Sequence, residues 1–171
     1  GGYDGKQQYR FKSIDDIDEK LDFSKEYVLE KFLNFKQEIS IAVTRFKDGK
    51  ISIYEPSENK HEKGILRESK IPANIDKNIL KKSQDIAVKF AEKLNYVGTL
   101  NIEFMVDQKG DLYFLEWSNR CHNGMWHTVN SYKVCQFTNH VRAILGLEFI
   151  ENKKISNATM TNILGDEITH F

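Results

Sequence analysis

The sequence has few cysteines, no excess of charge of either sign and no long apolar run. Its 171 residues carry 25 basic and 25 acidic side chains, and a net charge of zero gives no electrostatic reason to expect nucleic acid or an anionic membrane as a partner. No apolar run approaches the ~20 residues that span a bilayer, and we expect no secretory leader. The two cysteines, Cys121 and Cys135, are too few for a disulfide framework and lack metal-ligand spacing. We therefore expect a cytoplasmic protein.

What the chain does contain is enough apolar surface for a core. Hydrophobic residues make up 40% of it and aromatic residues 12%, which suits one domain or a large part of one. The first residues, Gly1 to Lys6, form a glycine-rich segment without an initiator methionine. Because a glycine loop normally follows a strand that holds it in place, we expect this chain to be a fragment of a longer protein.

Periodicity in the sequence predicts an α+β domain in which antiparallel hairpins pack with a few helices. Apolar alternation and turn residues predict strands at Tyr9–Lys12, Tyr27–Leu33, Glu38–Phe46, Lys50–Tyr54, Gly64–Ala73, Tyr96–Asp107, Asp111–Ser118 and Ser156–Leu164. Helical spacing and capping residues predict helices at Ser13–Leu21, Asp76–Asn95 and Ser131–Leu145. Asn59, Lys60 and His61 are expected in a polar loop.

A predicted hairpin places two glutamates face to face. If Lys109-Gly110 is a two-residue turn between the strands Tyr96–Asp107 and Asp111–Ser118, then Glu103 lies opposite Glu116. Two carboxylates opposite each other on one sheet face repel and destabilise the pairing. A hard cation such as Mg²⁺, with nucleotide phosphates completing its shell, removes that cost. The pair therefore predicts a metal site, although two solvated glutamates remain the alternative in so charged a chain.

The loop after this hairpin carries two further candidates. Arg120 offers a fixed fork of donors that suits phosphate or carboxylate, and His122 exchanges protons near neutral pH. Beside two opposed carboxylates, we interpret them as substrate-binding groups rather than as an ordinary surface loop. Glu30 and Glu38 lie in or near apolar strands, where an outward, solvated orientation is the simpler interpretation.

Several segments, in order and with near-family spacing, resemble the N5-carboxyaminoimidazole ribonucleotide synthetases of purine (IMP) biosynthesis, a family of ATP-grasp ligases. The matching stretches include Gly1–Lys6, Glu30–Leu33 with Glu38, Glu58–His61 with Gly64–Leu66, Tyr96–Thr99 with Glu103-Phe104, Arg120–Asn123, Gln136–Ile144 and Asn162–Gly165. The resemblance implies an ATP-grasp fold, with residues 1–147 as part of the ATP-grasp domain and residues 148–171 as the start of a carboxy-terminal region.

The resemblance also implies roles for individual residues. The nucleotide phosphates would lie against Gly1, Gly2, Tyr3, Asp4, Gly5, Lys6 and Gln7. The adenine and ribose would contact Glu30, Lys31, Phe32, Leu33, Glu38 and His61, with Leu115 and Glu116 also at the nucleotide. Glu103 and Glu116 would hold Mg²⁺, in agreement with the hairpin argument. Tyr3, Arg120 and His122 would contact aminoimidazole ribonucleotide.

The implied reaction uses ATP to convert bicarbonate to carboxyphosphate, from which CO₂ reaches the amine of the ribonucleotide. The family implies a homodimer when full length, and a chain lacking both ends should be inactive alone. Alternatives are another ATP-grasp carboxylate–amine ligase and a non-catalytic ATP-binding fragment. The sequence departs from the family pattern at Gln7, at Leu115, at Asn119 and Cys121 where the family has prolines, and at Trp126, with His127 one position after the family's second histidine.

Overall fold

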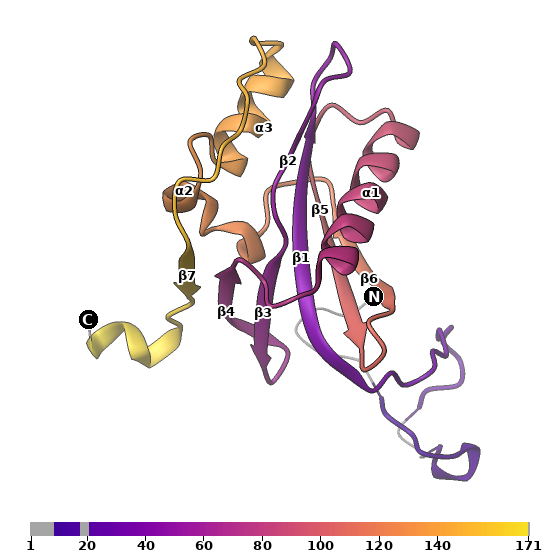
Figure 1. Cartoon of the computed structure of the whole chain (residues 1–171). Coiled ribbons are helices and arrows are strands. Elements are labelled where there is room, and N and C mark those ends of the chain that lie inside the picture. Colours follow the sequence, from indigo (N-terminus) through magenta and orange to yellow (C-terminus); the bar gives the residue numbers. More distant parts are fainter. Residues whose placement is uncertain (1–8, 18–20, 171) are drawn as a thin grey trace.

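The computed structural model describes residues 9–17 and 21–170, whose strands form one antiparallel sheet (Figure 1). Strand order across the sheet is β6-β5-β1-β3-β4-β7, and β2 pairs with β1. The strands are β1 (Phe35–Arg45), β2 (Ile51–Ile53), β3 (Ser57–Glu62), β4 (Ile65–Ile71), β5 (Gly98–Asp107), β6 (Leu112–Ser118) and β7 (Ala158–Thr161). The helices are η1 (Ile14–Asp16), α1 (Lys77–Lys93), η2 (Asn123–Met125), α2 (Thr128–Ser131), α3 (Gln136–Leu145) and η3 (Gly165–His170). This architecture confirms the predicted α+β class.

The two faces of the central strands have different chemistry because side chains alternate along a strand. On one face, apolar side chains of β1 and β5 pack against α1 and form the main core, which includes Ile39, Ile41, Val43, Leu100, Ile102, Phe104, Val106, Ile79, Ala87 and Ala91. Each fully buried aliphatic or Phe side chain contributes about 1.5–3 kcal/mol. The other face carries buried polar side chains, among them Ser40, Thr44, Asn101 and Glu103. Helix α3 lies on that side in Figure 1.

Helix α1 confirms the prediction for this part of the chain. The Asp76 carboxylate caps it by accepting hydrogen bonds from the backbone N–H groups of Asn78 and Ile79, at 2.8 and 2.9 Å. Its buried residues recur every four positions, which is the spacing of one helix face. No helix in residues 9–17 and 21–170 is long and apolar enough to cross a membrane.

Two predicted strands and part of one predicted helix are wrong. Tyr9–Lys12 and Tyr27–Leu33 form no strand, and Val28 and Leu29 are 87% and 89% exposed. Within the described residues these segments have no partner strand, and an apolar run without one has nothing against which to pair. Of the predicted helix Ser13–Leu21, the described residues form only the short helix η1, with the Asp16 carboxylate accepting from the Ser13 N–H at 3.0 Å, and residues 18–20 lie outside the described residues.

Two other elements differ from the prediction. Residues 57–62 form strand β3 between β1 and β4 rather than a polar loop, although their sequence has no apolar alternation. The predicted helix at residues 131–145 begins only at Gln136, as α3, because Ser131 ends the short helix α2 and Tyr132 has an extended backbone that pairs with Lys154. Its predicted end is confirmed, since Gly146 has φ +68°, a conformation that glycine adopts at little cost.

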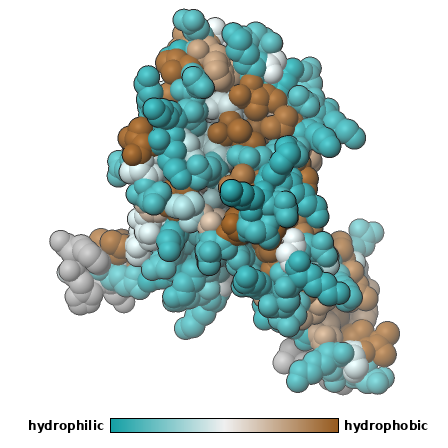
Figure 2. All heavy atoms as spheres, viewed as in Figure 1, coloured by the Kyte–Doolittle hydropathy of each residue, from teal (hydrophilic) through white to brown (hydrophobic). Residues whose placement is uncertain are grey.

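The surface seen in Figure 2 is mostly hydrophilic, with hydrophobic side chains in separate patches. Apolar exposure is also found on β6, the strand at one edge of the described sheet. Tyr113, Phe114, Leu115 and Trp117 of this strand are 38–51% exposed. In this structure β6 therefore presents aromatic side chains next to an edge.

Candidate metal and substrate site

Glu103 of β5 and Glu116 of β6 are directly opposite each other, as predicted. The hairpin reaches this register differently from the prediction, because Val106 rather than Asp107 pairs with Leu112. The turn therefore contains three residues rather than two, and Gly110 adopts φ +87° within it. A bulge then leaves Leu115 unpaired between the pairs Phe104–Phe114 and Glu103–Glu116. The bulge compensates for the longer turn and restores the glutamate pairing.

The Glu103 carboxylate is held inside the polar face of the sheet. Glu103 is only 7% exposed, and the hydroxyl of Ser40 on the neighbouring strand β1 donates to its Oε1 at 3.0 Å. The Ser40 oxygen in turn accepts from Nδ2 of Asn59 on β3, at 2.5 Å. Glu116 differs, because 63% of its side chain is exposed. The pair thus combines one fixed, buried carboxylate with one open to solvent.

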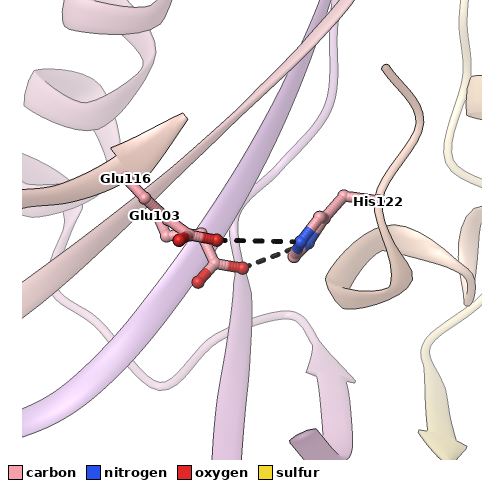
Figure 3. A group of neighbouring side chains, drawn as sticks. All are labelled: Glu103, Glu116 and His122. Carbon is pink, nitrogen blue, oxygen red and sulfur yellow. Dashed lines mark ion pairs between the residues drawn. The ribbon is translucent and has the colours of Figure 1, made fainter. Parts of the chain in front are cut away.

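The imidazole of His122 faces both carboxylates (Figure 3). Its Nδ1 lies 3.1 Å from Oε1 of Glu103, and its Nε2 lies 3.9 Å from Oε1 of Glu116. One ligand atom from each residue lies within 4.8 Å of the other two. Three elements of the chain, β5, β6 and the loop after β6, therefore converge at one point.

Electrostatics keep Glu103 charged. Burial alone raises the pKa of the Glu103 carboxyl, but His122, the Ser40 hydroxyl and the charge of His61 together lower it below the ordinary value. A buried carboxylate that stays ionised is a preformed anionic ligand. Two carboxylate oxygens suit a hard cation such as Mg²⁺, and an added imidazole nitrogen is also compatible with Mn²⁺ or Zn²⁺. The donor set therefore fits a divalent cation.

A second acid–base pair lies beside this cluster. Glu38 of β1, on the same face as Ser40, forms an ion pair with Nδ1 of His61 on β3. The Glu38 carboxylate raises the pKa of His61, against the opposing effect of burial. The Glu38 and His61 side chains are 16% and 25% exposed. The solvated orientation expected for Glu38 is therefore wrong, as is the loop expected for His61.

Arg120 leaves the sheet with the same loop. Its side chain is exposed, and its guanidinium donates to the carbonyl of Cys121 at 3.0 Å. The Asn101 amide fixes the backbone of Arg120 by donating to its carbonyl at 2.9 Å. The backbone is thus anchored while the guanidinium lies at the surface, where an anion can reach it.

Comparison with known proteins identifies the family of the chain. The model of the ATP-grasp domain matches residues 1–137. The chain belongs to the ATP-grasp family. This confirms the fold implied by the sequence resemblance.

Among its relatives are the N5-carboxyaminoimidazole ribonucleotide synthases of Bacillus subtilis, 36% identical over 98% of this chain, and of Brucella melitensis, 34% identical over 98%. A solved ADP complex of an N5-carboxyaminoimidazole ribonucleotide synthetase matches 99% of this chain with a TM-score of 0.91 and 37% identity, and the chain covers 45% of it. The Aspergillus clavatus synthase complexed with ATP matches 96% with a TM-score of 0.85 and 30% identity, and the chain covers 44% of it. The chain spans about half the length, 45% and 47%, of the two curated relatives.

The structure bears on only some of the other residues implied by the ATP-grasp resemblance. Gly1, Gly2, Tyr3, Asp4, Gly5, Lys6 and Gln7 lie outside the described residues. Glu30, Lys31 and Phe32 are exposed and Leu33 is half-buried, in a segment without regular structure. Leu115 is the bulged residue of β6 and is 41% exposed. Nucleotide contacts at these positions remain predictions.

Trp126 and His127 show how the loop departs from the family pattern. His127 is 4% exposed, and its Nδ1 lies 3.0 Å from the Ser131 hydroxyl, so its imidazole belongs to the interior. Trp126 is half exposed and packs edge-on against Phe137. His127 is therefore a core residue, and within this loop it is the Arg120–His122 segment that carries the polar side chains of the site.

Sequence reasoning missed Ser40 and Asn59, which orient Glu103, and Gln136, whose amide holds the backbone of His122. One signal for Ser40 was available. It interrupts the apolar residues of a central strand with a small hydroxyl on the face opposite Ile39 and Ile41. Asn59 and Gln136 had none, because their partners are distant in the sequence.

Proposed function

We propose that this chain forms the nucleotide- and metal-binding part of an ATP-dependent ligase that carboxylates 5-aminoimidazole ribonucleotide with bicarbonate. The observation that carries the proposal is the convergence of Glu103, Glu116 and His122 in an ATP-grasp domain. The similarity to N5-carboxyaminoimidazole ribonucleotide synthases supports the choice of substrate. So does a solved Aspergillus clavatus synthase in complex with ADP and the ribonucleotide, at a TM-score of 0.74 and 28% identity.

In this proposal Glu103 and Glu116 hold Mg²⁺. The cation supplies charge neutralisation for the phosphates of ATP, which phosphoryl transfer requires in addition to positioning. The protein's own contribution is to fix the first carboxylate in the sheet through Ser40, so that no reorganisation is needed when the cation binds. Glu38 and His61 would face the ribose and nucleotide from the neighbouring strands.

Arg120 and His122 would face the ribonucleotide. A guanidinium matches a phosphate or carboxylate through paired donors, and the exposure of Arg120 leaves these donors accessible. His122, whose imidazole faces both carboxylates, would lie between the ribonucleotide and the phosphates of ATP. The reaction would pass through carboxyphosphate, formed from bicarbonate and ATP, and would end with carboxylation of the exocyclic amine.

The rest of the proposal concerns the whole protein. The ATP-grasp domain would comprise residues 1–147, residues 148–171 would begin the carboxy-terminal region, and the complete enzyme would be a cytoplasmic homodimer. The supporting observation for the domain is that the family model ends at residue 137, inside α3. The edge strand β6 and its exposed aromatic side chains are consistent with further chain covering this side.

The test measures cation-dependent ADP binding by calorimetry, with Mg²⁺ present or replaced by a chelator. The wild-type chain should bind ADP more tightly with Mg²⁺, and Glu116→Gln should remove most of that gain. Glu68→Gln is the matched control, since Glu68 is also an exposed glutamate of the same sheet, on β4. Equal Mg²⁺ dependence in Glu116→Gln and Glu68→Gln would contradict the metal assignment.

A second measurement addresses the substrate. Phosphate release by the full-length protein that requires both bicarbonate and 5-aminoimidazole ribonucleotide supports the proposed ligase. Phosphate release with another carboxylate or amine instead supports a different ATP-grasp ligase. Binding of Mg·ADP with no ribonucleotide binding at all supports a non-catalytic nucleotide-binding domain.

A further inference from the structure

Gln136, the first residue of α3, reaches back to the loop that carries His122. It is fully buried, and its Nε2 donates to the backbone carbonyl of His122 at 2.7 Å. The backbone N–H of His122 donates in return to Oε1 of Gln136 at 3.1 Å. One side chain thus satisfies both backbone hydrogen-bonding groups of His122, as a neighbouring strand would. His122 lies in a loop with no such strand, so Gln136 takes over this function.

Gln136 is itself held at both its side chain and its backbone. Asn101 of β5 donates through Nδ2 to Oε1 of Gln136 at 3.4 Å and to the carbonyl of Arg120 at 2.9 Å. The backbone N–H of Gln136 donates to the Thr128 hydroxyl at 3.2 Å, which ties α3 to α2. Asn101 is two residues from Glu103 on the same strand face. The strand that carries the buried carboxylate is therefore connected to the loop through two buried amides.

We propose that Gln136 is a positioning residue that holds the Arg120–His122 segment at the two carboxylates. The proposal rests on the proposed function, in which this segment contacts the ribonucleotide. Because an amide offers a donor and an acceptor in one plane, Gln136 fixes the orientation of the His122 peptide as well as its distance. That orientation sets where the imidazole points, and the imidazole points at Glu103 and Glu116.

A packing role alone would make Gln136 equivalent to another buried amide of the same helix. Asn139 provides that comparison, since it is also fully buried on α3. Its Nδ2 donates to the hydroxyls of Ser52 and Tyr54, at 3.0 and 2.8 Å, and neither of these residues belongs to the loop. Gln136→Met removes three side-chain hydrogen bonds and Asn139→Leu removes two, and each puts an apolar side chain in place of an amide. Only Gln136→Met removes hydrogen bonds to the loop.

The first measurement is amide hydrogen exchange of the 171-residue chain, followed by NMR. In Gln136→Met the His122 amide should exchange about tenfold or more faster relative to the amides of β5, because its acceptor is gone. In Asn139→Leu any loss of stability should accelerate the His122 and β5 amides together and leave their ratio unchanged. Gln136→Asn, which keeps the amide but is one methylene shorter, should behave like Gln136→Met and provides a second variant if Gln136→Met does not fold.

The second measurement is calorimetric binding of 5-aminoimidazole ribonucleotide and of Mg·ADP. Both Gln136 variants should weaken ribonucleotide binding about tenfold while changing Mg·ADP binding less than about twofold, and Asn139→Leu should change neither selectively. An exchange ratio unchanged in both Gln136 variants, or changed equally in Asn139→Leu, overturns the positioning role. Absence of ribonucleotide binding by the wild type would count against the proposed function, while the exchange ratio would still decide the role of Gln136.

Discussion

Removing the charge of one carboxylate at a time should affect the metal-free chain unequally. Glu103 is buried, accepts a hydrogen bond from Ser40 and has a pKa below its ordinary value of 4.5. Its stabilising contribution is therefore fully present above pH 4.5 and is lost as pH falls through the lowered pKa. At neutral pH, Glu103→Gln should cost about 2 kcal/mol, the range for hydrogen bonds to charged groups. For a chain of this size that lowers Tm by about 4–8 °C.

Glu116→Gln should behave differently, since 63% of the Glu116 side chain is exposed. Water screens its repulsion from Glu103, and a surface substitution of this kind changes stability by about 0.5 kcal/mol or less. The two carboxylates therefore share a site but not an energetic role. Glu103 contributes to the folded state as well as to the site, and Glu116 contributes mainly when a cation is present.

Adding a cation should make the Glu116 carboxylate contribute to stability as well. A ligand at 100 times its Kd stabilises the folded state by about 2.7 kcal/mol. With Mg²⁺ or Mn²⁺ in that excess the wild-type Tm should rise by about 5–10 °C. Both variants should lose most of this rise, and Glu68→Gln should keep it.

Thermal denaturation followed by circular dichroism, with and without a chelator, measures the Tm of the wild type and of the three variants, Glu103→Gln, Glu116→Gln and Glu68→Gln. A metal-free Glu103→Gln chain as stable as the wild type would contradict the role assigned to the buried carboxylate. A cation-dependent rise that persists in either variant would show that the ion binds elsewhere.

Three further predictions concern the surrounding residues. Burial lowers the pKa of His127 from 6.5 to about 4, so the unfolded chain binds the extra proton between these values. The free energy of unfolding should therefore fall by up to about 3 kcal/mol as pH is lowered from 6.5 to 4. Urea denaturation at a series of pH values measures this, and His127→Asn should flatten the pH dependence. An identical slope in both proteins would refute the assignment. Gly124→Ala would place a Cβ 2.6 Å from the Ser40 hydroxyl, which should cost about 1–3 kcal/mol of stability in a urea titration. It should also weaken cation binding through Ser40, which a titration with Mg²⁺ measures. Unchanged cation affinity would separate Ser40 from the site. Arg120→Ala should weaken ribonucleotide binding about tenfold or more in calorimetry and leave Mg·ADP binding nearly unchanged, and the opposite selectivity would assign Arg120 to the nucleotide.

The sequence was sufficient to predict the elements whose identity is set locally. Helix α1 has a capping aspartate and a four-residue apolar spacing, and β5 has strict apolar alternation, so both could be located without tertiary information. Strand β3 could not, because its residues Ser57 and Asn59 are buried among polar partners rather than in the apolar core. Hydrophobic periodicity does not detect a strand whose inward face is polar. Tyr27–Leu33 is the converse case, in which an apolar run has no neighbouring strand among the described residues.

The glutamate pairing was predicted correctly from an incomplete description of the hairpin. The turn contains one residue more than a two-residue turn, and the bulge at Leu115 adds one residue on the same strand. Either feature alone would have moved Glu116 to the opposite face of the sheet, because side-chain direction alternates with every residue. A bulge has no reliable sequence signal, so the prediction of Glu103 opposite Glu116 could not have included it.

The precision of this site comes from a polar layer inside the fold. Buried polar groups destabilise a protein unless they find partners, and a hydrogen-bonded network favours a single arrangement. Here the hydroxyls of Ser57 and Ser69 both donate to the carbonyl of Gly124, at 2.8 and 2.5 Å, and Asn101 donates to that of Arg120. The backbone carbonyls of the loop after β6 thus accept hydrogen bonds from side chains of the sheet. Placement of the loop therefore depends on polar side chains of the sheet, and substitutions in the buried layer should alter binding at the surface without contacting a ligand.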